Sequence, residues 1–325
     1  MLFRVYCEHA FTTKDTKITK FGVVITRNRR ILRALRGAQN KVNVAHYPHK
    51  SLKNHKEKTM AAKIKHLAII SDNYSLLSRF YQALFGMKTS KSPRPESAVA
   101  IGDGYIGMNI IPQKLGRQAG LEHFGLEVED VETVAARLRD KYPTVQLTKR
   151  PTNRPFAGIS THDPEGYVFD LSQQQMTNRS EVYVEGEWKQ ERYISHFTLR
   201  ALNPANLAKF YREVYELQEM EKPADDPNHY LTDGRVTIIV APWAITDYEG
   251  AGIEPRHMDH LGFRVEDLDA FKKDLDKLIK RNPALSPKPG GSEGEIRLKL
   301  LAKCKHGQFQ LADPDGVPID VSTGR

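Results

Sequence analysis

Hydrophobic and polar residues follow a regular pattern from residue 63 onward. Residues 64–70 form an apolar run typical of a buried strand. Residues 77–84 place apolar side chains at i, i+3, i+4 and i+7, which predicts an amphipathic helix, and Gly86 is placed to end it. Two further strands turn through Asp103-Gly104. The pattern therefore predicts a unit made of one strand, one helix and several more strands.

This unit recurs three times with its landmarks at matching spacing. His66 and His196 are each followed 46 residues later by a proline. In the second and fourth units a strand histidine is followed seven residues later by an Asp that precedes an amphipathic helix, and the histidines are His123 and His260. Internal repeats of this kind define an architecture better than local propensity does. We expect four copies arranged as two pairs, in an α+β protein.

Charge separates the first 59 residues from the rest of the chain. They hold 14 Lys and Arg against three acids, whereas the remainder holds 35 against 37, so the net charge of +9 belongs to this segment. We expect residues 1–59 to be a basic, disordered extension. A targeting peptide, an arm for an anionic partner and a segment without a selected role are its alternative interpretations. The near-neutral remainder does not favour nucleic acid as a partner of the folded body.

The domain boundaries follow from the same pattern. We predict paired domains at residues 60–173 and 193–325, joined by a polar linker at 174–192 that holds one possible extra strand near Tyr183. The two cysteines form no disulfide framework, which favours a reducing, cytoplasmic setting. No apolar run reaches the roughly 18–20 residues that a membrane span requires. Pro287 to Gly294 has the composition of a mobile loop, not of a phosphate-binding loop that opens a helix.

Candidate metal ligands lie on the strands that open and close these units. Side chains alternate across a strand, so apolar residues can face the helices while the histidines and one Asp of each half face the other way. Two imidazoles and one carboxylate with open positions are the ligand set of non-heme Fe(II) sites. We predict a divalent metal, with Fe(II) favoured and Mn(II), Zn(II) or Ni(II) as alternatives. The candidate ligands are His66, His123 and Asp170 in the first half and His196, His260 and Asp320 in the second.

The motifs around these residues resemble the vicinal oxygen chelate superfamily, which includes glyoxalase I, bleomycin-resistance proteins and type I extradiol dioxygenases. The matching segments are KIKHLAII, GLEHFGLEVEDVETV, YISHFTLR and MDHLGFRVEDLDAF, together with DPEGYVFDLS and DPDGVPIDVS. The resemblance covers residues 63–323. It implies paired βαβββ modules that form two tandem open-barrel cups, with the six residues above as metal ligands.

Two departures from the family pattern affect the expected activity. The closing acid is usually Glu, whereas both halves have Asp at this position. Extradiol enzymes carry a His and a Tyr shortly before the D-P-x-G turn, but the Tyr position is Gln310 here and Ser160 in the first half. His306 lies close to the His position but off its spacing, and it is the best candidate for a residue next to the metal. The other candidate acid/base residues are Tyr248 and His257, together with His162, His229 and Tyr230.

The resemblance implies a metal-dependent enzyme that binds a small substrate through vicinal oxygens. We expect a dioxygenase-like oxidoreductase. The alternatives are a glyoxalase-type isomerase or lyase, and a metal-free binding protein of the bleomycin-resistance type. No membrane partner is expected, and the chain is expected to be a monomer or a homodimer. Fold alone does not decide among these functions.

Overall fold

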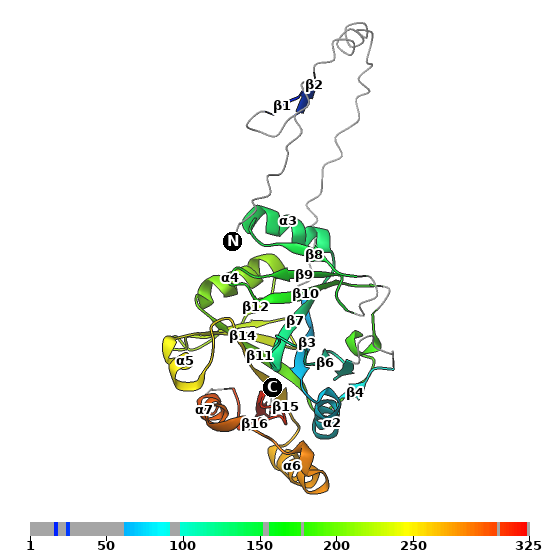
Figure 1. Cartoon of the computed structure of the whole chain (residues 1–325), viewed down its shortest axis with the longest axis vertical. Helices are drawn as coiled ribbons and strands as arrows, with labels where there is room; N and C mark the ends of the chain where they lie inside the picture. The colour runs from blue at the N-terminus through cyan, green and yellow to red at the C-terminus, as the bar shows by residue number, and fades with distance from the viewer. Residues whose placement is uncertain are drawn as a thin grey trace, which may run out of the picture. The chain divides into compact units, whose positions relative to one another are not determined.

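The computed structural model describes residues 16–18, 24–26, 62–91, 98–151, 156–176, 179–303 and 306–323 (Figure 1). The chain divides into two compact units, Met1–Glu57 and Lys58–Arg325. In the first unit, strands β1 (Thr16–Ile18) and β2 (Val24–Thr26) pair antiparallel. The rest of residues 1–59 lies outside the described residues, so the predicted disorder of this segment stays a prediction. All four predicted modules lie in the second unit.

The first two modules form one eight-stranded mixed sheet. Its strands are β3 (Lys63–Ser71), β4 (Lys88–Thr89), β5 (Val99–Gly102), β6 (Gly107–Pro112), β7 (Gly120–Val128), β8 (Leu147–Lys149), β9 (Ile159–His162) and β10 (Val168–Gln173). Their order is β4-β5-β6-β3-β7-β10-β9-β8. The two opening strands, β3 and β7, pair antiparallel at the centre. Each also pairs in parallel with the closing strand of its own module, β6 or β10.

The last two modules repeat this arrangement with one edge strand fewer. The strands are β11 (Tyr193–Ala201), β12 (Gln218–Glu219), β13 (His229–Thr232), β14 (Thr237–Pro242), β15 (Met258–Arg264), β16 (Phe309–Ala312) and β17 (Pro318–Ser322). Their order is β12-β13-β14-β11-β15-β17-β16. The predicted α+β class, with two tandem sheets built from paired modules, is confirmed. We call the histidine-bearing faces of the two sheets the first cup and the second cup.

Each module carries one main helix after its opening strand, and short polar side chains cap these helices. The helices are α2 (Tyr74–Phe85), α3 (Val131–Lys141), α4 (Pro204–Tyr215) and α6 (Leu268–Arg281). Asp130 and Asp267 accept backbone N–H bonds at the first turns of α3 and α6. The Asp that follows His123 and His260 by seven residues is therefore a helix cap. Its recurrence reflects local helix chemistry, not the site.

Two expectations about loops were wrong. Pro287 to Gly294 was predicted to be a loop that opens no helix, but α7 (Gly291–Leu301) begins inside it. Gly290 has the left-handed φ of 82° at the cap, and the Glu-, Leu- and Lys-rich stretch after it favours a helix. The possible strand near Tyr183 is instead the short 3₁₀ helix η2 (Glu181–Tyr183). The structure also has two short helices that we did not predict, α5 (Ile245–Ala251) and η3 (Pro283–Leu285).

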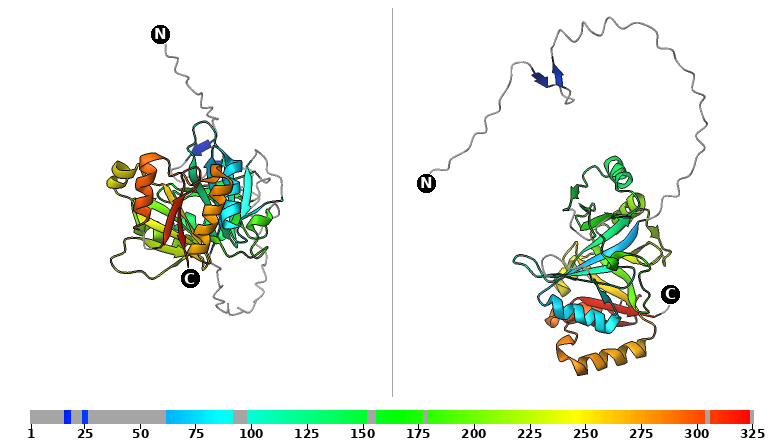
Figure 2. Two further views of the ribbon diagram at one scale, coloured as in Figure 1. Left: turned by 90° about the horizontal axis from the view of Figure 1, so that it is seen from below. Right: turned by 90° about the vertical axis from the view of Figure 1, so that its right-hand side faces the viewer.

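Helices of one half pack on the sheet of the other half. Phe85 of α2 stacks on Phe263 of β15 with ring centroids 3.8 Å apart, and it also contacts Phe271 of α6. Figure 2 (right) shows α2 in cyan beside α6 in orange. Phe124 of β7 lies 5.0 Å from Phe197 of β11, between the centres of the two rings. The faces opposite the two cups therefore share one apolar core, and burial of such aromatic rings stabilises the contact.

Two buried tyrosine–aspartate hydrogen bonds cross between the halves in a symmetric way. The Tyr81 hydroxyl donates to Oδ2 of Asp313 at 2.8 Å, and the Tyr211 hydroxyl donates to Oδ2 of Asp163 at 2.8 Å. Both aspartates belong to the Asp-Pro turns of the other half. Burial and the adjacent carboxyl group raise the pKa of both tyrosines well above the usual value, so their hydroxyls remain donors. Each bond fixes a helix of one half to the turn that precedes the closing strand of the other.

Replacing these tyrosines tests the crossed hydrogen bonds. We expect Tyr81→Phe and Tyr211→Phe each to lower the free energy of unfolding by about 1–3 kcal/mol, because a buried carboxyl oxygen loses its donor. Tyr215→Phe is the matched control on α4, since the Tyr215 hydroxyl is buried without a hydrogen-bond partner among the described residues. Its removal should be neutral or stabilising. Equal losses in all three variants by denaturant unfolding would contradict the interpretation.

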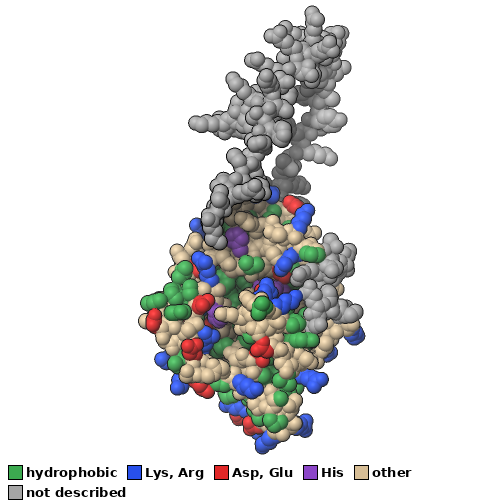
Figure 3. Space-filling view, viewed as in Figure 1, with side chains coloured by type: hydrophobic (Ala, Val, Ile, Leu, Met, Phe, Trp, Pro, Cys, Tyr) green, Lys and Arg blue, Asp and Glu red, His purple; other side chains and the backbone are tan. Residues whose placement is uncertain are grey.

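The surface of the folded unit agrees with its near-neutral charge. On the face seen in Figure 3, Lys and Arg side chains are interspersed with Asp and Glu. Across the described part of the chain, no helix is long and apolar enough to span a bilayer.

Candidate metal centres

Strand pairing brings together the three predicted ligands of the second cup. His196, His260 and Asp320 come from β11, β15 and β17, are all buried, and place one ligand atom each within 4.8 Å of the others. Gly262 of β15 faces His196 on one side and Asp320 on the other. A Cβ atom on Gly262 would lie 1.9 Å from Cε1 of His196. The imidazole therefore needs a glycine at this position of the neighbouring strand.

Two buried polar atoms of the second triad lack a hydrogen-bond partner among the described residues. They are Nε2 of His196 and Oδ2 of Asp320, which lie 3.7 Å apart. Buried polar groups without partners are rare and costly, so an orphaned nitrogen beside an orphaned oxygen indicates a ligand between them. The other carboxyl oxygen, Oδ1 of Asp320, accepts a 3.0 Å hydrogen bond from Gln310. These donor atoms fit a divalent metal ion.

Burial disfavours the charged forms of two members of the second triad, His196 and Asp320. It lowers the pKa of His196 well below the usual value, and His260, His306 and Arg264 lower it further. Burial raises the pKa of Asp320, opposed by the Gln310 hydrogen bond. A bound cation would offset the charge of the ionised carboxylate and would be ligated by the neutral imidazole.

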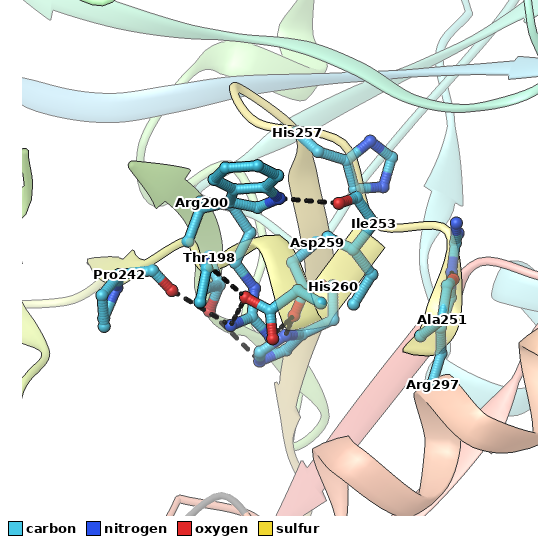
Figure 4. Close-up of polar contacts among 12 residues, drawn as sticks. Thr198, Arg200, Pro242, Ala251, Ile253, His257, Asp259, His260 and Arg297 are labelled. Carbon is cyan, nitrogen blue, oxygen red and sulfur yellow. Dashed lines mark hydrogen bonds and ion pairs between the residues drawn. The ribbon is translucent and has the colours of Figure 1, made fainter. Parts of the chain in front are cut away.

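Asp259 is a site residue that the sequence analysis missed. Its Oδ2 lies 2.9 Å from Nδ1 of His260 and 3.2 Å from Nη2 of Arg200 (Figure 4). Neighbouring residues on a regular strand face opposite ways, but the β11–β15 pairing shifts register here, between Leu261 and Met258. The irregularity lets Asp259 reach the ring of the next residue. Carboxylates of this kind orient metal-binding histidines and fix their tautomer.

The first cup repeats these features with its ligands already in contact. Nε2 of His66 lies 3.1 Å from Nε2 of His123, which lies 3.4 Å from Oδ2 of Asp170. The Ser160 hydroxyl donates to Oδ1 of Asp170 at 2.9 Å, in the place that Gln310 takes in the second half. Glu122 bonds Nδ1 of His123 and is skipped in the β3–β7 register, like Asp259 in its strand. The available sequence signal for both carboxylates was an acid directly before His123 and His260.

The electrostatic state of the first triad differs from that of the second. Burial would lower the pKa of His123, but Asp170 and Glu122 outweigh it and raise the pKa to about 9. Burial opposes ionisation of Asp170, yet the hydrogen bond and charge of His123 hold its pKa well below the usual value. A proton on His123 therefore neutralises this triad, and a metal must displace that proton.

The predicted linker fills the first cup. Tyr183 and Phe156 pack on the His66 ring, with ring centroids 5.5 Å and 5.0 Å away, within a small apolar cluster that includes Val182. The Tyr183 ring lies 2.2 Å from where a Cβ on Gly107 would be. Val182 and Tyr183 of the predicted linker thus form part of the interior of the first half.

The second cup is open beside its triad. A cavity of about 330 Å³ adjoins His196. Its polar lining includes Tyr230, Asp226, Arg264 and His306. The two cups therefore differ in access although their ligand sets are the same.

Of the predicted acid/base residues, His306 and Tyr230 line this cavity, and His306 is the one whose ring faces His196. Its ring centroid lies 5.9 Å from that of His196 and 4.6 Å from that of Tyr230. Burial lowers the pKa of His306, which favours the neutral imidazole. Tyr248 is 50% exposed on α5, and His257 points away from His260 (Figure 4); neither lines the cavity. The expected placement of Tyr248 and His257 at the site was wrong, because it relied on sequence proximity to His260.

Comparison with known proteins agrees with this geometry. Residues 63–171 match the model of the Glyoxalase/Bleomycin resistance protein/Dioxygenase superfamily. Over these residues the match confirms the resemblance seen in the sequence motifs. No curated protein is similar to the chain at a significant level.

Solved structures show the same fold over both halves. The Mn(II)-bound glyoxalase from Novosphingobium aromaticivorans is 12% identical, with a TM-score of 0.57, over 82% of this chain and 83% of that chain. The 2,3-dioxygenase LapB from Pseudomonas sp. KL28 is 16% identical, with a TM-score of 0.57, over 82% and 93%. An extradiol ring-cleaving dioxygenase from B. fuscum is 15% identical, with a TM-score of 0.54, over 83% and 74%. At these identities the likeness shows the fold alone.

A methyl group at Gly262 tests the geometry of the second triad. We expect Gly262→Ala to displace the His196 ring and to remove metal from the second triad, because backbone and ring cannot both keep their positions. Gly250→Ala is the control, since a Cβ there meets no atom within 4 Å. Metal analysis of the purified variants measures the effect. A metal content equal to that of the unchanged protein would show that the ring does not need this glycine.

Proposed function

We propose that the second cup is a metal-dependent active site for a small substrate with vicinal oxygens, and that its chemistry is dioxygenase-like. The observation that carries the proposal is the pair of orphaned ligand atoms on His196 and Asp320, beside an open cavity of about 330 Å³. A purely structural metal site is closed by protein ligands, whereas a catalytic site keeps positions for substrate. The three-residue ligand set meets that requirement.

His196, His260 and Asp320 would hold the ion, with Fe(II) favoured. A bound divalent ion would supply Lewis-acid polarisation of the substrate oxygens, and iron would also supply redox chemistry with O₂. Asp259 holds His260 in orientation through Nδ1, and Gln310 holds Asp320 through Oδ1. These two contacts leave two atoms as the ones that would ligate the ion, namely Nε2 of His260, which lies 3.2 Å from the Thr198 hydroxyl, and Oδ2 of Asp320.

His306 is positioned to move a proton. Its Nε2 is buried and has no hydrogen-bond partner in the described part of the chain. A neutral imidazole at the cavity can accept a proton from a substrate hydroxyl at Nε2 and return it later. The Tyr230 hydroxyl, which donates to Asp226 at 2.8 Å, holds that wall of the cavity in place.

A glyoxalase-type isomerase is the second candidate. It is favoured by Gln310, which bonds Asp320 at the position where the family resemblance calls for the tyrosine of extradiol enzymes. A metal-free binding protein is the third possibility. The three functions differ in metal content and in oxygen consumption.

Metal analysis comes first among the tests of this proposal. We expect His260→Ala and Asp320→Ala to lose the metal of the second triad, because each of these two substitutions removes one of its three ligands. His123→Ala should retain that metal, because His123 belongs to the first triad. Protein purified without chelators and analysed by elemental mass spectrometry gives the answer. No metal in the unchanged protein after reconstitution with Fe(II), Mn(II), Zn(II) or Ni(II) would leave the binding-protein alternative.

Oxygen uptake separates the two enzyme functions. If the protein binds metal, we expect the Fe(II)-loaded form to consume O₂ with a catechol or hydroquinone. Turnover of a diketone without O₂ uptake would instead select the isomerase.

Replacing His306 tests its proton-transfer role. We expect His306→Gln to lower kcat by about 10²–10⁴-fold, the usual contribution of a general acid or base. Metal content should stay unchanged, because His306 is not among the ligands. His162→Gln is the control, since His162 lies at the end of β9 and bonds the backbone of Gln146 and Asp163. A kcat within about threefold of the unchanged protein would exclude the role.

A further inference from the structure

Arg264 is an unpaired cation in the second cup. It lines the cavity beside His196, and its Nε is buried without a hydrogen-bond partner. Among the described residues, the Arg264 guanidinium forms no ion pair or hydrogen bond. The side chain as a whole is only partly buried. An arginine that lines a cavity without a counter-ion among the described residues is suited to bind an anion there.

The equivalent position of the first cup holds the opposite charge. Glu127 follows His123 by four residues, as Arg264 follows His260. Glu127 pairs with Ser172 in the sheet register, and Arg264 pairs with Ser322. Both positions therefore face the same part of their cups, and the repeat carries an acid in one and a base in the other.

The first cup contains a partner for its charge. Arg179 of the linker forms an ion pair with the buried Glu127 and donates to the Ser172 hydroxyl at 2.7 Å. Ser322, the counterpart of Ser172, lines the cavity of the second cup together with Arg264. The chain thus supplies a cation to the acidic cup, and no described segment supplies an anion to the basic one.

The other charges of the second cavity do not neutralise Arg264. The Asp226 carboxylate accepts hydrogen bonds from the Tyr230 hydroxyl and from the backbone N–H of Asn228. Glu221 is exposed. The Lys222 ammonium donates to two backbone carbonyls, those of Asp226 and Asn228, and to no carboxylate in the described residues.

We propose that the second cup selects a substrate that carries an anionic group, such as a carboxylate, with Arg264 and Ser322 as its recognition pair. The inference rests on the proposed function and names the substrate class of that site. The comparison with the first cup supports only the pairing of opposite charges, not the shape of the bound group. Thr237 stands opposite His196 where Gly107 stands opposite His66, so a ring cannot lie on the second histidine as Tyr183 lies on the first.

Two matched probes test this recognition on the full-length, metal-reconstituted protein without O₂. They are 3,4-dihydroxybenzoate and 3,4-dihydroxybenzyl alcohol, which share the ring and the vicinal oxygens and differ in the negative charge. By titration calorimetry we expect the acid to bind about 10–100-fold more tightly. This is the usual contribution of one hydrogen bond between charged groups that are shielded from water. Arg264→Gln should reduce the preference to within about threefold, and Arg264→Lys should restore part of it.

The control variant is Lys277→Gln, which makes the same change in net charge on the exposed face of α6, where Lys277 pairs with Asp274. It should keep the full preference. Equal affinity of the unchanged protein for both probes, no measurable binding of the acid, or an unaltered preference in Arg264→Gln would each overturn the proposal.

A metal-free arm separates this inference from the proposed function. In the presence of a chelator, 4-hydroxybenzoate should bind more tightly than 4-hydroxybenzyl alcohol, and Arg264→Gln should abolish the difference. If the protein binds no metal but keeps this Arg264-dependent preference, the metal-dependent function fails while the anion site stands. If the Arg264→Gln variant retains its metal but the unchanged protein shows no preference for the acid, the anion site fails while the metal site stands.

Discussion

The site depends on how the opening strands of paired modules meet. β11 and β15 run antiparallel at the centre of their sheet, and β17 runs parallel to β15. These pairings place two histidines and one aspartate on one face, with Gly262 between two of them. A register shift of one residue would turn these side chains toward the apolar core. The two sheets share an apolar core, in which Phe85 packs against Phe263 and Phe124 against Phe197. This core determines which face of each sheet is buried and which face carries the candidate ligands.

The two halves keep one ligand set but have diverged in access. In the first cup the linker places Tyr183 on His66 and Arg179 on Glu127, so the cup is filled by the chain itself. In the second cup the equivalent space remains a cavity lined by Arg264 and His306. Duplication thus produced one half whose interior is completed by protein and another suited to receive a small molecule.

The crossed tyrosine–aspartate bonds connect the helices to the sites. Tyr81 and Tyr211 each hold the Asp-Pro turn of the other half, and that turn leads into the strand bearing Asp320 or Asp170. The position of each closing carboxylate therefore depends on the helix of the opposite half. The halves are separate as repeats in the sequence, but they are not independent as packed units.

The sequence by itself determined the four modules, their pairing and the identity of all six candidate ligands, because spacing and strand alternation are local properties that survive duplication. It also indicated His306, which lines the cavity beside His196. Tertiary structure alone decided that the linker fills one cup, that register irregularities direct Glu122 and Asp259 to the histidines, and that Tyr248 and His257 lie elsewhere. Those features arise from contacts between segments far apart in the chain. Hydrophobic periodicity carries no information about such contacts, because it records which face of an element is buried and not which segment covers it.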